Sequence, residues 1–235
     1  MTIKVLLFAF SVLLLAKDAQ GCQKECHERF HNSELDVKTR KKGCRPGSQA
    51  AVRNDDVHDT NKLGRTTTYI RCLKEYQDKC GFDSIGFFSS PDVLEAYFNT
   101  TSELCEEGTS LNTVAIENLQ CFNETLSKTN CRKEARNVSS SYVRRRFEEA
   151  EFEPQNTLNL ECLEKALSAS CIVLSISENC GKDVGYATLD FIRRSKILEN
   201  VCLDQAARLI LDELHNLQLS EDKIQSVTLL LEKPE

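Results

Sequence analysis

The chain has 235 residues and a formal net charge of −6, with 40% hydrophobic residues, 28% charged residues, 4 Pro and 9 Gly. This balance is typical of a folded globular protein and argues against a disordered or low-complexity chain. No basic domain is available to neutralise a phosphate backbone, so the composition also argues against nucleic-acid binding.

The N-terminus predicts a secretory signal peptide over residues 1–21. Lys4 precedes an apolar run from Val5 to Ala16, and Ala19 and Gly21 supply the small residues that a signal peptidase requires. The run is shorter than the roughly 20 residues that a membrane-spanning helix needs. We therefore expect a mature, secreted chain that begins at Cys22 and has no stable insertion in a membrane.

All the cysteines lie after this predicted cut: Cys22, Cys26, Cys44, Cys72, Cys80, Cys105, Cys121, Cys131, Cys162, Cys171, Cys180 and Cys202. An even, dispersed set in a secreted chain predicts that all of them form disulfides. Within one helix, Cys162 and Cys171 would be about 13 Å apart, whereas a bridge needs Cα atoms roughly 4.4–6.8 Å apart. Each must therefore bond to another segment, and for Cys202 both remain candidates.

Residues 22–65 predict a basic, loop-rich arm pinned at Cys22, Cys26 and Cys44. Its K-T-R-K-K run over 38–42 would suit a polyanion or a processing protease, and a solvated loop is the favoured interpretation.

The same arm contains one metal-like pattern, Cys22-x3-Cys26-His27-x3-His31. Two thiolates and two imidazoles would suit zinc. Because secretion favours oxidation of both cysteines, we expect disulfides here and no metal or cofactor in the protein.

Helical patterns begin after the arm. Thr68 to Cys80 has apolar residues at helical steps, Ser89-Ser90-Pro91-Asp92 is a typical helix start, and Ser110 is a candidate cap for the next helix. The inner positions of these helices are Ile70, Leu73, Tyr76, Val93, Leu94, Tyr97, Phe98, Leu104, Cys105, Leu111, Ala115, Leu119, Phe122 and Leu126.

Four more helices are expected further on, over Tyr142 to Phe152, Leu158 to Ile176, Ala187 to Leu217 and Ser220 to Leu231. A helical hairpin should bend at Cys180-Gly181. The sequence thus predicts an all-α fold, a disulfide-stapled bundle of about six or seven helices with an irregular basic N-terminal arm. A boundary near Phe152-Glu153-Pro154 would separate an N-terminal unit (66–152) from a C-terminal unit (153–235).

Two kinds of modification are suggested. Asn99, Asn123 and Asn137 each begin a glycosylation sequon. Arg144-Arg145-Arg146 is a tribasic site at which cleavage would give two chains held by disulfides, although a charged helix face is the favoured interpretation.

No catalytic signature is present. The chain lacks a nucleophile elbow, a zinc-protease motif and a phosphate-binding glycine loop. The only histidines are His27, His31, His58 and His215, and His215 is expected in a half-buried or surface position. We therefore expect a protein that is not an enzyme.

Two short cysteine patterns stand out: C-x8-C-x8-C-G from Cys162 to Gly181, and C-G-x-D, which occurs at Cys80 and again at Cys180. With the signal peptide, the helical body and the cysteine count, they resemble the build of large cysteine-rich proteins of arthropod venom and haemolymph, such as the scoloptoxin families. The resemblance implies a secreted venom-type or body-fluid protein and carries over no functional residues.

These observations favour a non-enzymatic secreted effector, a toxin-like protein that binds an extracellular protein target. The alternative is a carrier of a lipid or small hydrophobic ligand, in which an apolar cavity of at least ~300 Å³ would be lined by Phe82, Phe87, Phe88, Tyr97 and Phe98. A hydrolase or protease inhibitor without a recognisable motif is the third hypothesis.

Overall fold

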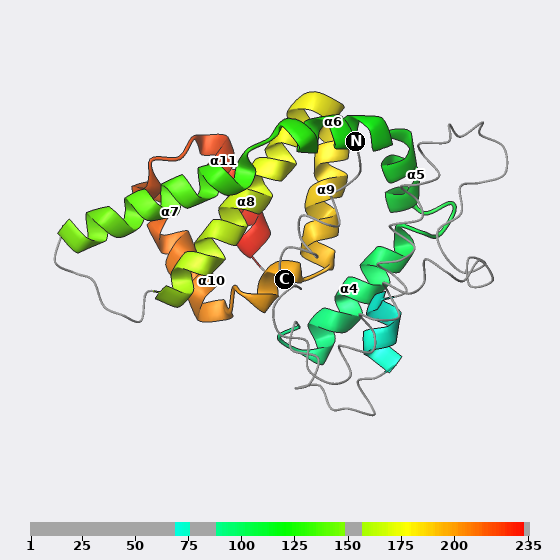
Figure 1. Cartoon of the computed structure of the whole chain (residues 1–235), viewed down its shortest axis with the longest axis horizontal. Helices are drawn as coiled ribbons and strands as arrows, with labels where there is room; N and C mark the ends of the chain where they lie inside the picture. Colours follow the sequence, from blue (N-terminus) through cyan, green and yellow to red (C-terminus); the bar gives the residue numbers. More distant parts are fainter. Residues whose placement is uncertain (1–68, 76–87, 149–156, 233–235) are drawn as a thin grey trace. The chain divides into compact units, whose positions relative to one another are not determined.

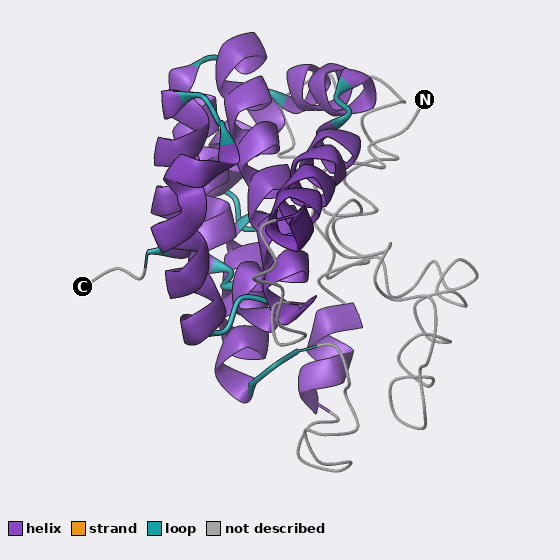
Figure 2. Cartoon of the chain, turned by 90° about the vertical axis from the view of Figure 1, so that its left-hand side faces the viewer, coloured by secondary structure: helices purple, strands orange, loops and turns teal. Residues whose placement is uncertain are grey.

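The computed structural model describes residues 69–75, 88–148 and 157–232. The predicted signal peptide and basic arm lie outside these ranges, as do Cys22, Cys26, Cys44, Cys80, the K-T-R-K-K run, His27, His31 and His58. Within the described ranges all regular secondary structure is helical, with nine α-helices, two 3₁₀ turns and no strand (Figure 2). The predicted all-α class is confirmed.

Two compact units make up the chain, divided between Asn123 and Glu124. The predicted boundary lay near residue 153, so the division falls about one helix earlier. The predicted boundary would have separated helix α7 (Cys131–Glu148) from helix α8 (Thr157–Cys180), but these two helices pack against each other in the second unit.

Unit 1 contains a helix over 69–75, helix α4 (Pro91–Glu103) and helix α5 (Ser110–Glu117) (Figure 1). Ile70, Leu73, Val93 and Leu94 are buried, as their spacing predicts. The Lys74 ammonium pairs with Glu95 and lies 4.9 Å from the centre of the Phe98 ring. An ion pair and a cation–π contact therefore join the 69–75 helix to α4.

Helix α4 starts where its sequence signal places it. The Ser90 side chain accepts a hydrogen bond from the Val93 amide at 3.2 Å, and Pro91 occupies the first helical position, where no donor is needed. We expect Ser90→Ala to lower the free energy of unfolding by about 1 kcal/mol, because one amide at the helix start loses its partner. Urea unfolding would measure the change. Ser90→Gly is the matched control, with an expected loss of only a few tenths of a kcal/mol; equal losses would contradict capping by the hydroxyl.

The helix predicted after Ser110 differs from the observed one in two ways. The cap is Thr109, whose hydroxyl accepts from the Asn112 amide at 3.2 Å and donates to the Glu103 carbonyl at 2.7 Å. The helix also stops at Asn118, and a separate helix α6 (Leu119–Lys128) follows. Asn118 donates its side-chain amide to the Val114 carbonyl, a local bond that competes with continuation of the helix.

Unit 2 is built around α8, which contacts α7, helix α9 (Lys182–Arg194), helix α10 (Asp204–Glu213) and helix α11 (Glu221–Leu231) (Figure 1). Its buried residues occupy most of its circumference: Cys162, Leu163, Ala166, Leu167, Ala169, Ser170, Cys171, Ile172, Val173 and Ile176. A helix that is apolar nearly all round is a central helix.

Helix α7 begins at Cys131, eleven residues before the predicted start at Tyr142. Its buried residues are small: Cys131, Ala135 and Ser139 recur at steps of four. These side chains give almost no hydrophobic signal, which is why apolar periodicity missed the first half of the helix.

The hairpin of α8 and α9 bends at Cys180-Gly181, as predicted, and Gly181 has a φ of +104° that favours glycine. The continuous helix predicted from Ala187 to Leu217 is wrong. Lys196 adopts a left-handed conformation after α9, and the 3₁₀ turns η4 (Ile197–Asn200) and η5 (Leu214–Leu217) flank α10. The interruption brings Cys202 to Cys162.

Candidate functional site

Two disulfides brace α8 within unit 2. Cys131–Cys171 joins it to α7, and Cys162–Cys202 joins it to the segment before α10. The second pairing is one of the two that the sequence left open for Cys202. Cys72, Cys105, Cys121 and Cys180 are also disulfide-bonded, and no cysteine in the described ranges is free.

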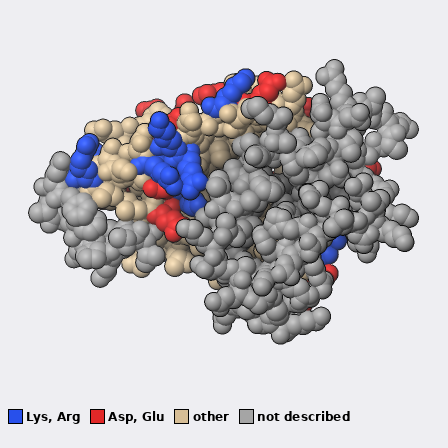
Figure 3. Space-filling model, viewed as in Figure 1, with Lys and Arg blue, Asp and Glu red and all other residues tan. Residues whose placement is uncertain are grey.

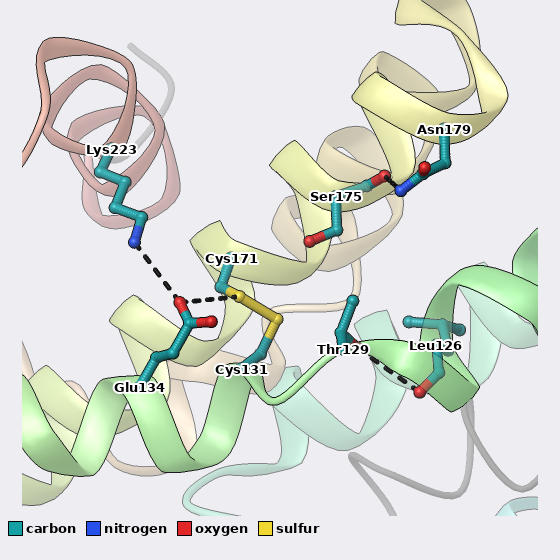
Figure 4. The surroundings of a disulfide bond; sticks show 8 residues. All are labelled: Leu126, Thr129, Cys131, Glu134, Cys171, Ser175, Asn179 and Lys223. Carbon is teal, nitrogen blue, oxygen red and sulfur yellow. Dashed lines mark hydrogen bonds and ion pairs between the residues drawn. A yellow bond between two sulfur atoms is a disulfide. The ribbon is translucent and has the colours of Figure 1, made fainter.

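A charged contact adjoins the Cys131–Cys171 disulfide (Figure 4). The Glu134 carboxylate lies 3.5 Å from the Lys223 ammonium of α11 and 3.9 Å from the Cys171 sulfur. Helices α7, α8 and α11 therefore meet at this point.

A groove of about 240 Å³ lies between α9, η4, α10 and the end of α11. Its floor is apolar and consists of Ile192, Leu198, Ala207, Leu211, Leu230 and Leu231. Cys202 also lines it, so the disulfide to Cys162 fixes one wall to α8. The groove is partly open to solvent.

Three cations line the groove together with these apolar residues. Arg193, Lys196 and Arg208 line the groove, and their side chains form no ion pair with any other described residue. Acidic groups are present as well: Glu199 and Asp204 already take part in other interactions, and Glu232 is exposed at the end of α11. The groove thus offers apolar contact together with three cationic donors.

One exposed leucine lies close to the groove along the chain. Leu203 is 65% exposed between the lining residues Cys202 and Asp204. Leu209 is 43% exposed, but it is two positions from both Ala207 and Leu211 and so lies on nearly the opposite face of α10 from these lining residues. No motif in the sequence pointed to the groove.

In all three sequons the hydroxyl residue is buried. Asn99 and Asn137 are exposed and Asn123 is half-buried, whereas the hydroxyl residues two positions on, Thr101, Thr125 and Ser139, are all buried. Two residues along a helix lie on nearly opposite faces. Each hydroxyl also has a structural role, and that of Ser139 donates to Glu164 of α8 at 3.1 Å.

The tribasic run and His215, also considered as candidates, lie in helical segments. Arg144-Arg145-Arg146 lies within α7, in line with the favoured helical interpretation. His215 is exposed. In the part of the chain that the structure describes, no group of His, Cys, Asp and Glu side chains could hold a metal ion.

Of the aromatic residues proposed for a carrier cavity, the three described ones, Phe88, Tyr97 and Phe98, do not line the groove. Phe88 and Tyr97 are buried with ring centres 5.7 Å apart, and Phe98 faces the cations Arg71 and Lys74. Phe82 and Phe87 lie outside the described residues.

The chain matches no family model, no curated protein and no solved structure. No helix within the described ranges is both long and apolar enough to span a membrane.

Proposed function

We propose that the chain is a secreted, non-enzymatic binding protein, an effector of venom or body-fluid type, whose groove takes a segment of an extracellular protein. The observation that carries this proposal is the combination of an apolar floor with three cations that have no ion-pair partner among the described residues. The signal peptide predicted over 1–21 and the disulfides around α8 support secretion.

A protein segment suits the groove better than an enclosed small ligand. Pockets for drug-sized ligands have volumes of about 300–1,000 Å³ and bury most of the ligand, whereas this groove is smaller, at about 240 Å³, and partly open. Such a volume accommodates one or two apolar side chains of a larger partner. The exposed Leu203, between the lining residues Cys202 and Asp204, would extend the contact beyond the groove.

The charges define the partner's chemistry. Arg193, Lys196 and Arg208 would pair with carboxylates on either side of an apolar anchor, such as Leu or Phe. The partner segment is therefore acidic and apolar, with the anchor in the groove and the carboxylates at its rim.

Selection of random 12-residue peptides on the immobilised protein tests this proposal. Enriched peptides should contain Leu or Phe beside Asp or Glu, and Arg208→Glu should weaken their binding about tenfold or more, because one charge-assisted bond is lost and a repulsion added. The matched control is Arg194→Glu. That residue follows Arg193 on α9 but does not line the groove, and it pairs with Asp190.

Two results would overturn the proposal: enriched peptides without acidic residues, or binding that Arg208→Glu leaves unchanged. Native mass spectrometry of the protein purified from a eukaryotic secretion medium tests the carrier instead. A bound small molecule that is lost on denaturation would favour the carrier, and a mass explained by protein and glycans alone would favour the binding effector.

A further inference from the structure

The sequons that begin at Asn99 and Asn137 lie inside the helices α4 and α7. An enzyme that modifies a sequon must contact the asparagine amide and the hydroxyl two residues on together, because both groups define the motif. Within a helix these two side chains are about 200° apart around the axis. One enzyme surface therefore cannot reach both groups while the helix is intact.

The hydroxyl of each of these sequons is also engaged inside the fold. Thr101 is 0% exposed, and its hydroxyl donates a hydrogen bond to the Tyr97 carbonyl at 2.8 Å. The buried Ser139 hydroxyl donates to a carboxylate oxygen of Glu164, on α8, at 3.1 Å. Thr101 therefore becomes accessible only when α4 unwinds, and Ser139 only when α7 leaves α8.

The asparagines themselves lie on the outer side of these helices. Asn99 and Asn137 are exposed, so a glycan on either amide nitrogen would extend into solvent without displacing a packed side chain. The surface near Asn137 is polar: Lys133 and Arg136 are exposed, and Figure 3 shows Lys and Arg side chains at the surface over α7. A bulky, polar glycan is compatible with such a solvated face.

We propose that Asn99 and Asn137 carry N-linked glycans that are attached before α4 forms and before α7 packs on α8. Asn123 is half-buried, so we do not extend the inference to it. The inference rests on the secretion in the proposed function, because the transferase acts in the secretory pathway, but it does not depend on the groove.

The transfer is a substitution without oxidation or reduction. A bond forms between the asparagine amide nitrogen and C1 of the sugar, and the bond from C1 to the diphosphate of a lipid-linked oligosaccharide breaks. The lipid diphosphate leaves with the electron pair of that bond, and the amide gives up one proton. The modified amide keeps its second N–H.

A transfer assay with purified oligosaccharyltransferase and a lipid-linked oligosaccharide tests the order of events. The acceptor is the full chain made in bacteria, used folded with its disulfides and, separately, after reduction and alkylation. The folded chain should accept no glycan, whereas the unfolded chain should accept one at Asn99 and one at Asn137, located by peptide mass spectrometry. Equal transfer to both forms would overturn the proposal, as would an unfolded chain that accepts none at these positions.

The full chain secreted from a eukaryotic host provides a second test. Asn99→Gln and Asn137→Gln should each remove the mass of one glycan from the intact protein. Asn216→Gln is the matched control, because Asn216 is also exposed in a helical segment but begins no sequon; it should leave the glycan mass unchanged. Secreted protein without a glycan at either position would contradict the proposal. An unmodified chain retained in the cytosol would refute secretion instead, and the transfer assay would still decide the order of events.

Discussion

Removal of the Cys162–Cys202 disulfide by alanine at both positions is expected to lower the free energy of unfolding by about 4 kcal/mol. The two cysteines are 40 positions apart, and a cross-link over a loop of that length greatly restricts the unfolded chain. Alanine keeps the buried site apolar, so no unsatisfied hydroxyl is added. Urea unfolding, fitted to a two-state model, would measure the difference.

The Cys131–Cys171 disulfide provides an internal comparison, because its cysteines are also 40 positions apart. Its removal should lower the unfolding free energy by a similar amount. Only loss of Cys162–Cys202 should also weaken peptide binding, because Cys202 lines the groove. A loss below about 1 kcal/mol for both pairs would contradict this expectation. It would show that the unfolded chain is already restricted by residual structure, so that the cross-links add little.

The elements that the sequence predicts well are those with a strong local signal. Ser90 and Pro91 mark the start of α4, Gly181 marks the bend between α8 and α9, and both are found where expected. In each case the determining interaction lies within a few residues along the chain. Capping hydroxyls and glycines in left-handed conformations act locally, so they can be recognised without tertiary information.

The helix boundaries that the sequence predicts wrongly are those that depend on tertiary contacts. Helix α7 packs on α8 through Cys131, Ala135 and Ser139, which are too small to stand out as a hydrophobic face. No proline or glycine marks the break at Lys196 in the sequence. The break permits the disulfide between Cys202 and Cys162. A contact 40 positions away along the chain overrides a helical pattern that looks continuous.

The groove could not be predicted for the same reason. Its lining comes from α9, η4, α10 and α11, and it exists only because the predicted helix from Ala187 to Leu217 is interrupted. The cationic residues Arg193, Lys196 and Arg208 look like ordinary solvated positions in the sequence. Their common position around an apolar floor is a property of the fold.

Gly185→Ala is expected to destabilise the protein by about 1–3 kcal/mol, although alanine normally stabilises a helix interior by about 1 kcal/mol relative to glycine. A Cβ at position 185 would lie 2.6 Å from the Ser177 Cβ and 2.9 Å from the Ser177 Cα, so α9 and α8 could not keep their close approach. Thermal and urea unfolding would measure the sign of the change, which decides between helix propensity and helix packing.

Two further variants separate the causes. The double variant Ser177→Gly/Gly185→Ala should recover part of the stability that Gly185→Ala loses. Ser177→Gly removes the Ser177 side chain, but the Cα at position 177 stays 2.9 Å from the added Cβ. Gly181→Ala should also destabilise, but through its φ of +104°, since no atom lies within 4 Å of the added Cβ. Ser177→Gly should therefore not rescue Gly181→Ala. Rescue of both variants, or of neither, would contradict a packing role specific to Gly185, because only that glycine lies against Ser177.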